Sequence, residues 1–358
     1  MSDGTGRRVA IACQGGGSHT AFTAGVLQEL VGAPGTRIAA LSGTSGGAVC
    51  ALLAWYGLLH DDPGKARDLL DAFWARTATE DPWESAWNEL GIAALRIAGE
   101  VVTPEVSPYT YHSGAEEAFT RVLDDLIPFG TLAPPLPDAA PRLLVSAADV
   151  QTGEFRVFRS HGGAGVAPDH ITSRTLLASA AVPPLFRAVE VDGSLYWDGL
   201  FSQNPPIREL PDVVRGQAGA PPEEIWIVRI NPDRHPGEPT AMADIRDRRN
   251  ELAGSMSLHQ EIFFIGHMNG LVLDGRLGPD DKYRPIKLRC IGIAADVARD
   301  LDYASKLQRT PALLERLKAH GRAQGRRFLE LLGSERADEL TACTGRDVWG
   351  RDRPPAAG

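Results

Sequence analysis

The sequence predicts an α/β fold in three layers, α/β/α, with a central and mostly parallel sheet. Residues 9–12 form a short apolar run, and residues 21–31 then place apolar side chains at helical spacing. Residues 38–41 form a second apolar run, and residues 48–59 are apolar on all sides, which is typical of a buried helix. A chain that begins strand, helix, strand, helix favours parallel strands covered by helices.

Further strands are expected after residue 141. They cover residues 142–148, 155–158, 189–191, 194–197 and 224–230. Asp192-Gly193 separates the third and fourth of these runs and is a strong signal for a tight hairpin. A helix is expected over residues 172–181, because Pro183-Pro184 would end it.

We expect one domain over residues 1–358. Its core spans about residues 8–235, a helical insertion covers about 61–141, and a helical extension covers about 238–349. Within the insertion, Asp81 can cap a helix whose apolar stripe contains Trp83, Trp87, Leu90, Ala94, Ile97 and Val101. This stripe is interpreted as packing on the sheet, and the alternative is a lid or a lipid-docking surface.

Composition excludes several classes of function. The net charge of -9 argues against a nucleic-acid partner and gives no overall attraction to anionic membranes. No apolar run reaches about 18 residues, so no membrane-spanning helix is expected, and the polar N-terminus shows no secretory signal. The four scattered cysteines form no CxxC pair and suggest neither a zinc site nor a disulfide framework. We therefore expect a cytoplasmic protein with free thiols, possible peripheral membrane contact and no metal.

One short run carries the main indication of chemistry. It lies between a predicted strand and a predicted helix and reads Gly43-Thr44-Ser45-Gly46-Gly47. A serine between glycines at such a turn is typical of a nucleophile elbow, in which the hydroxyl is held exposed at a helix N-terminus. The pattern predicts Ser45 as a nucleophile, and the alternative is a glycine-rich turn with an incidental serine.

A serine hydroxyl needs a base that takes its proton. The triad of the α/β-hydrolases fits poorly, because only one predicted strand precedes the elbow strand. The downstream histidines lie in polar or helical stretches without a motif: His235, His259, His267 and His320. Asp198 is the better candidate, because it ends a predicted strand and catalytic groups collect at strand ends in open α/β sheets. An Asp-Gly turn without a catalytic role is the alternative for Asp198.

A second glycine-rich segment lies between the first strand and the first helix. It reads Gly15-Gly16-Gly17-Ser18-His19, and its backbone N–H groups could form an anion site at a helix N-terminus. No lysine followed by serine or threonine comes after the glycines, and Thr20 replaces the last glycine of the dinucleotide pattern, so neither phosphate-loop motif is met. An oxyanion hole is the remaining use.

These motifs, taken in order, resemble those of the patatin-like phospholipases. The likeness extends to residues 145–149, 177–186 and 198–206 and covers about residues 8–231. The resemblance implies a Ser-Asp dyad without histidine, no cofactor, and lipid esters as substrates. It assigns Ser45 as nucleophile and Asp198 as base. The oxyanion hole would come from Gly15, Gly16 and Gly17 with the backbone of Ser18 or His19.

This chain departs from the family pattern at three positions. His19 stands where the family has arginine or lysine, Thr20 where it has glycine, and Leu200 where it often has glycine. We expect the cation beside the oxyanion to be weaker and pH-dependent, since histidine titrates near neutral pH. Hydrolysis of lipid acyl esters is the leading hypothesis. Acyl transfer through the same acyl-enzyme and a non-catalytic role in binding lipid or a protein partner are the alternatives.

Overall fold

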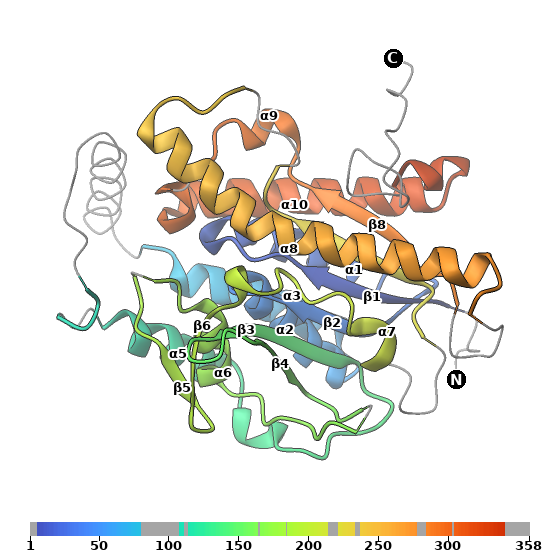
Figure 1. The fold of residues 1–358 in the computed structure, drawn as a ribbon, viewed down its shortest axis with the longest axis horizontal. Coiled ribbons are helices and arrows are strands. Elements are labelled where there is room, and N and C mark those ends of the chain that lie inside the picture. The colour runs from blue at the N-terminus through green and yellow to red at the C-terminus, as the bar shows by residue number, and fades with distance from the viewer. Residues whose placement is uncertain are drawn as a thin grey trace.

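The computed structural model describes residues 6–79, 107–110, 114–163, 165–183, 185–213, 221–232, 237–277, 284–302 and 304–340. Its centre is a mixed sheet with the strand order β5-β6-β3-β2-β1-β7-β8, in which β4 also pairs with β3 (Figure 1). The strands are β1 (Arg7–Cys13), β2 (Thr36–Gly43), β3 (Arg142–Asp149), β4 (Phe155–Arg159), β5 (Val189–Val191), β6 (Ser194–Asp198), β7 (Glu224–Arg229) and β8 (Lys287–Gly292). The contiguous set β3-β2-β1-β7-β8 is parallel, and β4, β5 and β6 form the antiparallel pairs.

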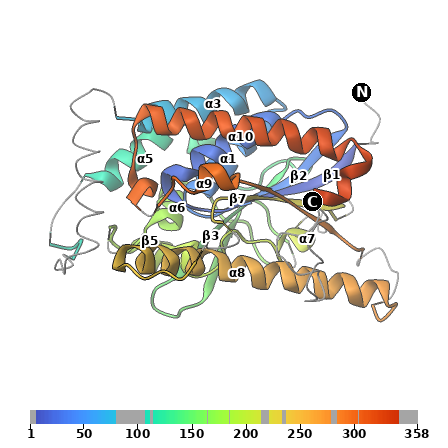
Figure 2. The same cartoon turned by 90° about the horizontal axis from the view of Figure 1, so that it is seen from above.

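Helices cover both faces of this sheet. They are α1 (Ala21–Leu30), α2 (Gly46–Leu59), α3 (Pro63–Thr77), α5 (Ala115–Leu126), α6 (Ser173–Ala180), α7 (Leu210–Val213), α8 (Met242–Leu273), α9 (Ala295–Ala298) and α10 (Pro311–Leu332). Seen from above, α1, α3 and α10 lie on one side of the sheet and α7 and α8 on the other (Figure 2). Each side has its own buried apolar cluster. The three-layer arrangement expected from the sequence is therefore confirmed.

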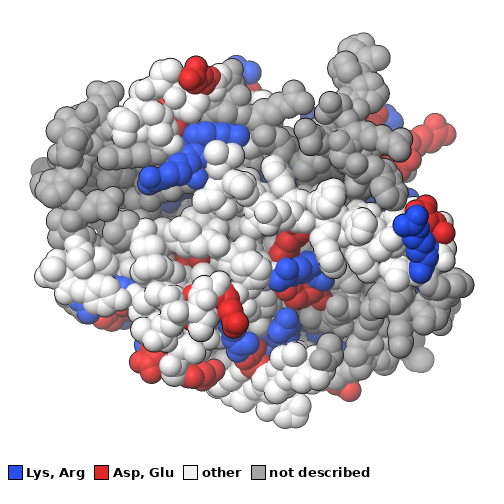
Figure 3. Space-filling view, viewed as in Figure 1, with Lys and Arg blue, Asp and Glu red and all other residues white. Residues whose placement is uncertain are grey.

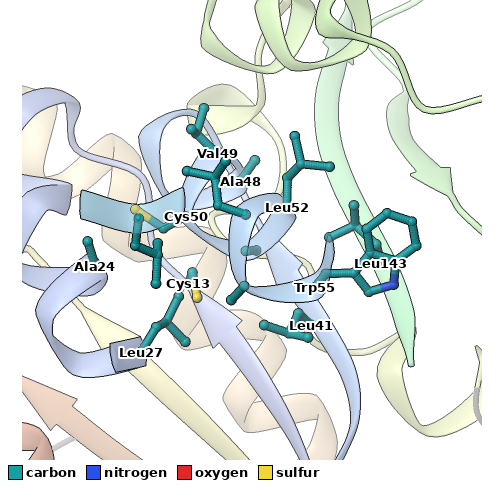
Figure 4. Packing of buried hydrophobic residues seen from close by; sticks show 14 of the residues in the cluster. Cys13, Ala24, Leu27, Leu41, Ala48, Val49, Cys50, Leu52, Trp55 and Leu143 are labelled. Atoms are coloured by element: carbon teal, nitrogen blue, oxygen red, sulfur yellow. The ribbon is translucent and has the colours of Figure 1, made fainter. Parts of the chain in front are cut away.

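The apolar helix α2 is the element beneath the predicted elbow, and it is buried as its sequence requires. Val49 and Leu52 pack in the same cluster as Cys13 of β1 and Leu41 of β2 (Figure 4). A helix that is apolar on every side leaves no polar face for solvent, so it is stable only between other elements. Burial fixes the position of its N-terminus, which follows Ser45 directly.

The C-terminal region contains the expected helices and one strand that the sequence pattern did not predict. Besides α8 and α10 it supplies β8, which pairs parallel with β7 and extends the sheet. The alternation of Lys287, Leu288, Arg289 and Cys290 carries this strand, but it lies within a long region of helical pattern. Cys13 and Cys50 are buried and have free thiols as expected, whereas Cys290 is disulfide-bonded, so the expectation of free thiols is wrong for that residue.

The insertion contributes α3 and α5, and the stripe expected between Trp83 and Val101 lies outside the described residues. Figure 3 shows the face on which α8 lies, where acidic and basic side chains are scattered among uncharged ones. Among the described residues on this face, no extended basic surface appears. None of the helices in the described residues combines the length and the hydropathy that a membrane span requires.

Candidate active site

Ser45 occupies a tight turn between the end of β2 and the start of α2. Its backbone has φ 55° and ψ -132°, a region that residues with a side chain rarely adopt. The hydroxyl of Ser179 accepts a hydrogen bond from the Ser45 N–H at 2.9 Å and holds this conformation. A Cβ on Gly43 would lie 2.6 Å from the backbone of Ala48, and one on Gly47 would collide with the carbonyl of Cys13. These contacts explain why the turn needs glycine on both sides of the serine.

Thr44 and Gly46 complete the turn. Thr44 Oγ1 lies 2.6 Å from Ser146 Oγ and donates to the carbonyl of Gln203 at 2.7 Å. Gly46 packs against Thr20, leaving no space for a side chain. Ser45 therefore sits at the N-terminus of α2 on a backbone fixed from both sides, where the helix dipole favours negative charge.

The sheet register brings Asp198 to Ser45. Gly43 at the end of β2 pairs with Val145 of β3, and Ala147 of β3 pairs with Asp198 at the end of β6. Strand β3 therefore places the end of β6 near the elbow that follows β2. Asp198 is buried and lines the same cavity as Ser45, whose hydroxyl lies close enough to affect the pKa of the Asp198 carboxyl group. The Leu200 N–H donates to Asp198 Oδ1 at 2.7 Å and orients the carboxyl group.

Burial determines the proton affinity of Asp198. Loss of water raises its pKa from the ordinary 3.8 to about 7, while the hydrogen bond from the Leu200 N–H and the nearby Ser45 hydroxyl oppose the rise. A carboxylate with a pKa near 7 can accept a proton from a neighbouring hydroxyl more readily than an ordinary aspartate. The pair thus has the proximity and the basicity that suit proton transfer.

The glycine-rich loop follows β1 and lies beside the elbow. A Cβ on Gly15 would lie 2.6 Å from the carbonyl oxygen of Thr44 and 2.9 Å from Ser45 Cβ, so the two turns pack directly together. The Gly15 N–H donates to Asn204 Oδ1 at 2.7 Å and so is already engaged. Among the described residues, no protein acceptor is found for the N–H groups of Gly16, Gly17 and Ser18.

His19 is placed differently from the expectation. Its N–H donates to the Gly16 carbonyl at 3.2 Å, and its ring Nε2 lies 2.8 Å from Ser305 Oγ. Burial, together with the charge of Lys306, lowers the pKa of His19 to about 3 against the opposing effect of Asp302. The ring is therefore neutral at physiological pH, and the expectation of a pH-dependent cation at His19 is wrong.

Ser45 and Asp198 open onto a cavity of about 670 Å³, a size typical of small-molecule sites. Gly15, Gly16, Gly17 and Ser18 line it as well. Most of its wall is apolar and comes from Val49, Phe73, Trp74, Phe119, Val122, Leu177, Val182, Leu185, Phe186, Leu200 and Leu307. The cations on the wall are Arg76, Lys306 and Arg309. The cavity thus joins a nucleophile–carboxylate pair to a long apolar surface.

The structure brings Ser45, Asp198 and the glycine-rich loop together and leaves the histidines elsewhere. Among the described residues no histidine lines the cavity: His259 and His267 lie on α8 and His320 on α10, and His235 lies outside the described residues. The described residues also contain no cluster of metal-ligating side chains.

Several residues of the site had no assigned role in the sequence. Ser179 and Asn204 stand in the stretches that resemble the family, but their bonds to Ser45 and Gly15 depend on contacts between distant segments. Lys306 comes from the C-terminal region and donates to Asn231 Oδ1 at 3.2 Å. No local pattern distinguishes Lys306 from other surface lysines, so only the fold reveals it.

Comparisons with solved structures gave remote matches. VipD from Legionella pneumophila is 14% identical with a TM-score of 0.41, covering 91% of this chain and 67% of its own. The type III effector protein ExoU is 15% identical with a TM-score of 0.35, covering 90% of this chain, which spans only 52% of that protein. No curated protein matches the sequence.

The sequence model of the patatin-like phospholipases matches residues 11–211. This span contains the glycine-rich loop, the elbow and Asp198, and it is more than half of the chain. The protein belongs to the patatin-like phospholipase family.

Proposed function

We propose that this protein is a serine acyl hydrolase that cleaves carboxylic esters of lipids through an acyl-enzyme on Ser45. The observation that carries the proposal is that Ser45, on its strained turn at the N-terminus of α2, and the buried Asp198 line the same apolar cavity. The apolar wall suits an acyl chain, and the pair at its end suits attack on the ester carbonyl.

The reaction begins when Ser45 Oγ attacks the carbonyl carbon and Asp198 takes the hydroxyl proton. The resulting oxyanion accepts hydrogen bonds from N–H groups of Gly16, Gly17 or Ser18, which have no protein acceptor in the described structure. Collapse of this intermediate breaks the ester C–O bond, and the leaving alcohol takes the proton from Asp198. Ser45 then carries the acyl group.

Water completes the cycle. Asp198, again ionised, takes a proton from a water molecule that attacks the acyl carbonyl, and a second oxyanion forms in the same place. Collapse releases the free acid and returns the proton to Ser45. Every proton transfer uses one carboxylate, which is consistent with a cavity whose described walls carry no histidine.

The test is hydrolysis of p-nitrophenyl acyl esters and of a phospholipid panel by the purified protein. We expect Ser45→Ala and Asp198→Asn each to abolish free-acid release while the circular dichroism spectrum stays unchanged. Ser160→Ala is the matched control, because it also removes a buried hydroxyl but one that does not line the cavity. This hydroxyl accepts a hydrogen bond of 2.8 Å from the Leu143 N–H. Full activity in Ser45→Ala would contradict the mechanism. Transfer of the acyl group to an added alcohol without release of acid would favour an acyltransferase.

A further inference from the structure

Helix α8 contacts the candidate site although it lies beyond the residues that match the family model. Two of its groups are involved. The carbonyl of Gly254 accepts from Gln14 Nε2 and from Asn204 Nδ2, each at 3.0 Å. About two helical turns further along α8, the carboxylate of Glu261 contacts the segment 203–208, which follows Asp198 in the chain.

Glu261 is the more unusual of the two, because it is a carboxylate with only 5% of its surface exposed. Oε1 accepts from Gln203 Nε2 at 2.6 Å, and Oε2 accepts from the Ile207 N–H at 2.5 Å and from the Arg208 N–H at 3.3 Å. Burying an acidic side chain is unfavourable unless its oxygens are bonded, and here three N–H donors converge on one carboxyl group. Glu261 therefore holds both ends of the 203–208 segment.

Gln203 carries this restraint to the elbow. Its side chain is bound to Glu261 and also donates to Glu209, at 3.0 Å and 3.2 Å for the two oxygens. Its backbone carbonyl accepts from Thr44 Oγ1 and from Ser146 Oγ, both at 2.7 Å. Thr44 precedes Ser45 directly, so only one residue separates α8 from the turn that carries the nucleophile.

The adjacent residue carries the restraint to the glycine-rich loop. Asn204 uses its Oδ1 for the Gly15 N–H and its Nδ2 for the Gly254 carbonyl. A displacement of the 203–208 segment would therefore shift the elbow and the loop together. Catalysis is sensitive to such shifts, since a displacement of about 1 Å at the reacting groups can cost roughly 100-fold in rate.

We propose that Glu261 is a positioning residue for the candidate active site and acts through Gln203 on Thr44 and through Asn204 on Gly15. The proposal rests on the function assigned to Ser45. Burial, with the charge of Glu209, raises the pKa of Glu261 to about 7, while the hydrogen bonds from Ile207, Gln203 and Arg208 oppose the rise. An apolar residue would fill the same space without that electrostatic cost, but it could not orient the segment.

The experiment compares Glu261→Gln with Ile265→Val, a buried change one turn along the same helix that touches none of these bonds. In Glu261→Gln one acceptor oxygen becomes an NH2 donor, so either the Gln203 side chain or the N–H groups of Ile207 and Arg208 lose their acceptor. We expect kcat for ester hydrolysis to fall roughly 10- to 100-fold with KM within about twofold of wild type. Ile265→Val should change neither constant.

Amide hydrogen exchange gives a readout that does not depend on activity. We expect peptides covering residues 13–20 and 43–47 to exchange at least about tenfold faster in Glu261→Gln, with no change in Ile265→Val. Gln203→Leu cuts the same link from the other side and should give the same pattern, which keeps the test decisive if Glu261→Gln fails to fold.

The outcomes separate the two proposals. Unchanged exchange in these peptides, or an equal change in Ile265→Val, would overturn the positioning role of Glu261. An inactive wild-type protein whose exchange still responds to Glu261→Gln would instead contradict the hydrolase function and support the structural link.

Discussion

Replacement of Asp198 by asparagine should abolish catalysis and at the same time stabilise the fold at alkaline pH. The carboxyl group is 1% exposed, and its pKa rises from 3.8 in the unfolded chain to about 7 when folded. Because the folded pKa is raised, this group favours folding most below pH 3.8, and its contribution is lost as pH rises through about 7. At 1.36 kcal/mol per pKa unit, the complete loss is about 4 kcal/mol.

The pH range of the effect follows from the same two pKa values. At pH 5 Asp198 is protonated in the folded protein but ionised in the unfolded chain, so part of its contribution to folding has already been lost. Between pH 5 and pH 8 the free energy of unfolding of the wild-type protein falls by about a further 2.5 kcal/mol through this group. Asparagine does not titrate, so the variant has no such loss. The stability gap between Asp198→Asn and wild type should therefore widen by about 2.5 kcal/mol across this range in favour of the variant.

Urea unfolding of both proteins at pH 5 and pH 8 measures this gap. Ester hydrolysis on the same samples should be undetectable in Asp198→Asn at both pH values. A gap that stays constant between pH 5 and pH 8 would refute the assignment of a raised pKa to Asp198. An active, pH-independent variant would refute its role as the base.

Three further changes probe the surroundings of the site. Gly15→Ala should abolish ester hydrolysis, because the new Cβ meets the elbow backbone at 2.6 Å, whereas Gly130→Ala, which meets nothing within 4 Å, should leave the kinetics unchanged. Ser179→Ala removes the acceptor of the Ser45 N–H and should lower the free energy of unfolding by about 1–3 kcal/mol and reduce kcat. Glu224→Gln weakens a buried ion pair made at 2.8 Å and 2.9 Å, and should cost about 3–5 kcal/mol in urea unfolding without changing KM.

Local patterns predicted most of the described strands of the sheet that precede residue 231. The expected strand at residues 38–41 is the core of β2, and the expected hairpin around Asp192-Gly193 joins β5 to β6. These elements were accessible because apolar runs and turn residues act over a few neighbours in the chain. The elbow is predictable for the same reason, because a tight turn packed against neighbouring backbone has no space for side chains and needs glycine.

The remaining features depend on contacts between distant segments. Residues 287–292 contain a short polar–apolar alternation, but it is their parallel pairing with β7 that makes them a strand of the sheet, and that partner is distant in the chain. His19 was expected to carry charge, but its bond to Ser305 and its burial are set by a segment almost 300 residues away. The roles of Lys306, Gly254 and Glu261 arise likewise from the packing of the C-terminal region against the loop and the elbow.

Covalent labelling by a fluorophosphonate, located by peptide mass spectrometry and followed from pH 5 to pH 9, tests the central claim most directly. We expect the label on Ser45 alone, at a rate that rises with pH around an apparent pKa of about 7, as ionisation of Asp198 requires. Asp198→Asn should lose this pH dependence together with most of the rate. Labelling at another residue, or a folded wild-type protein that is not labelled at any pH, would contradict the Ser45–Asp198 mechanism.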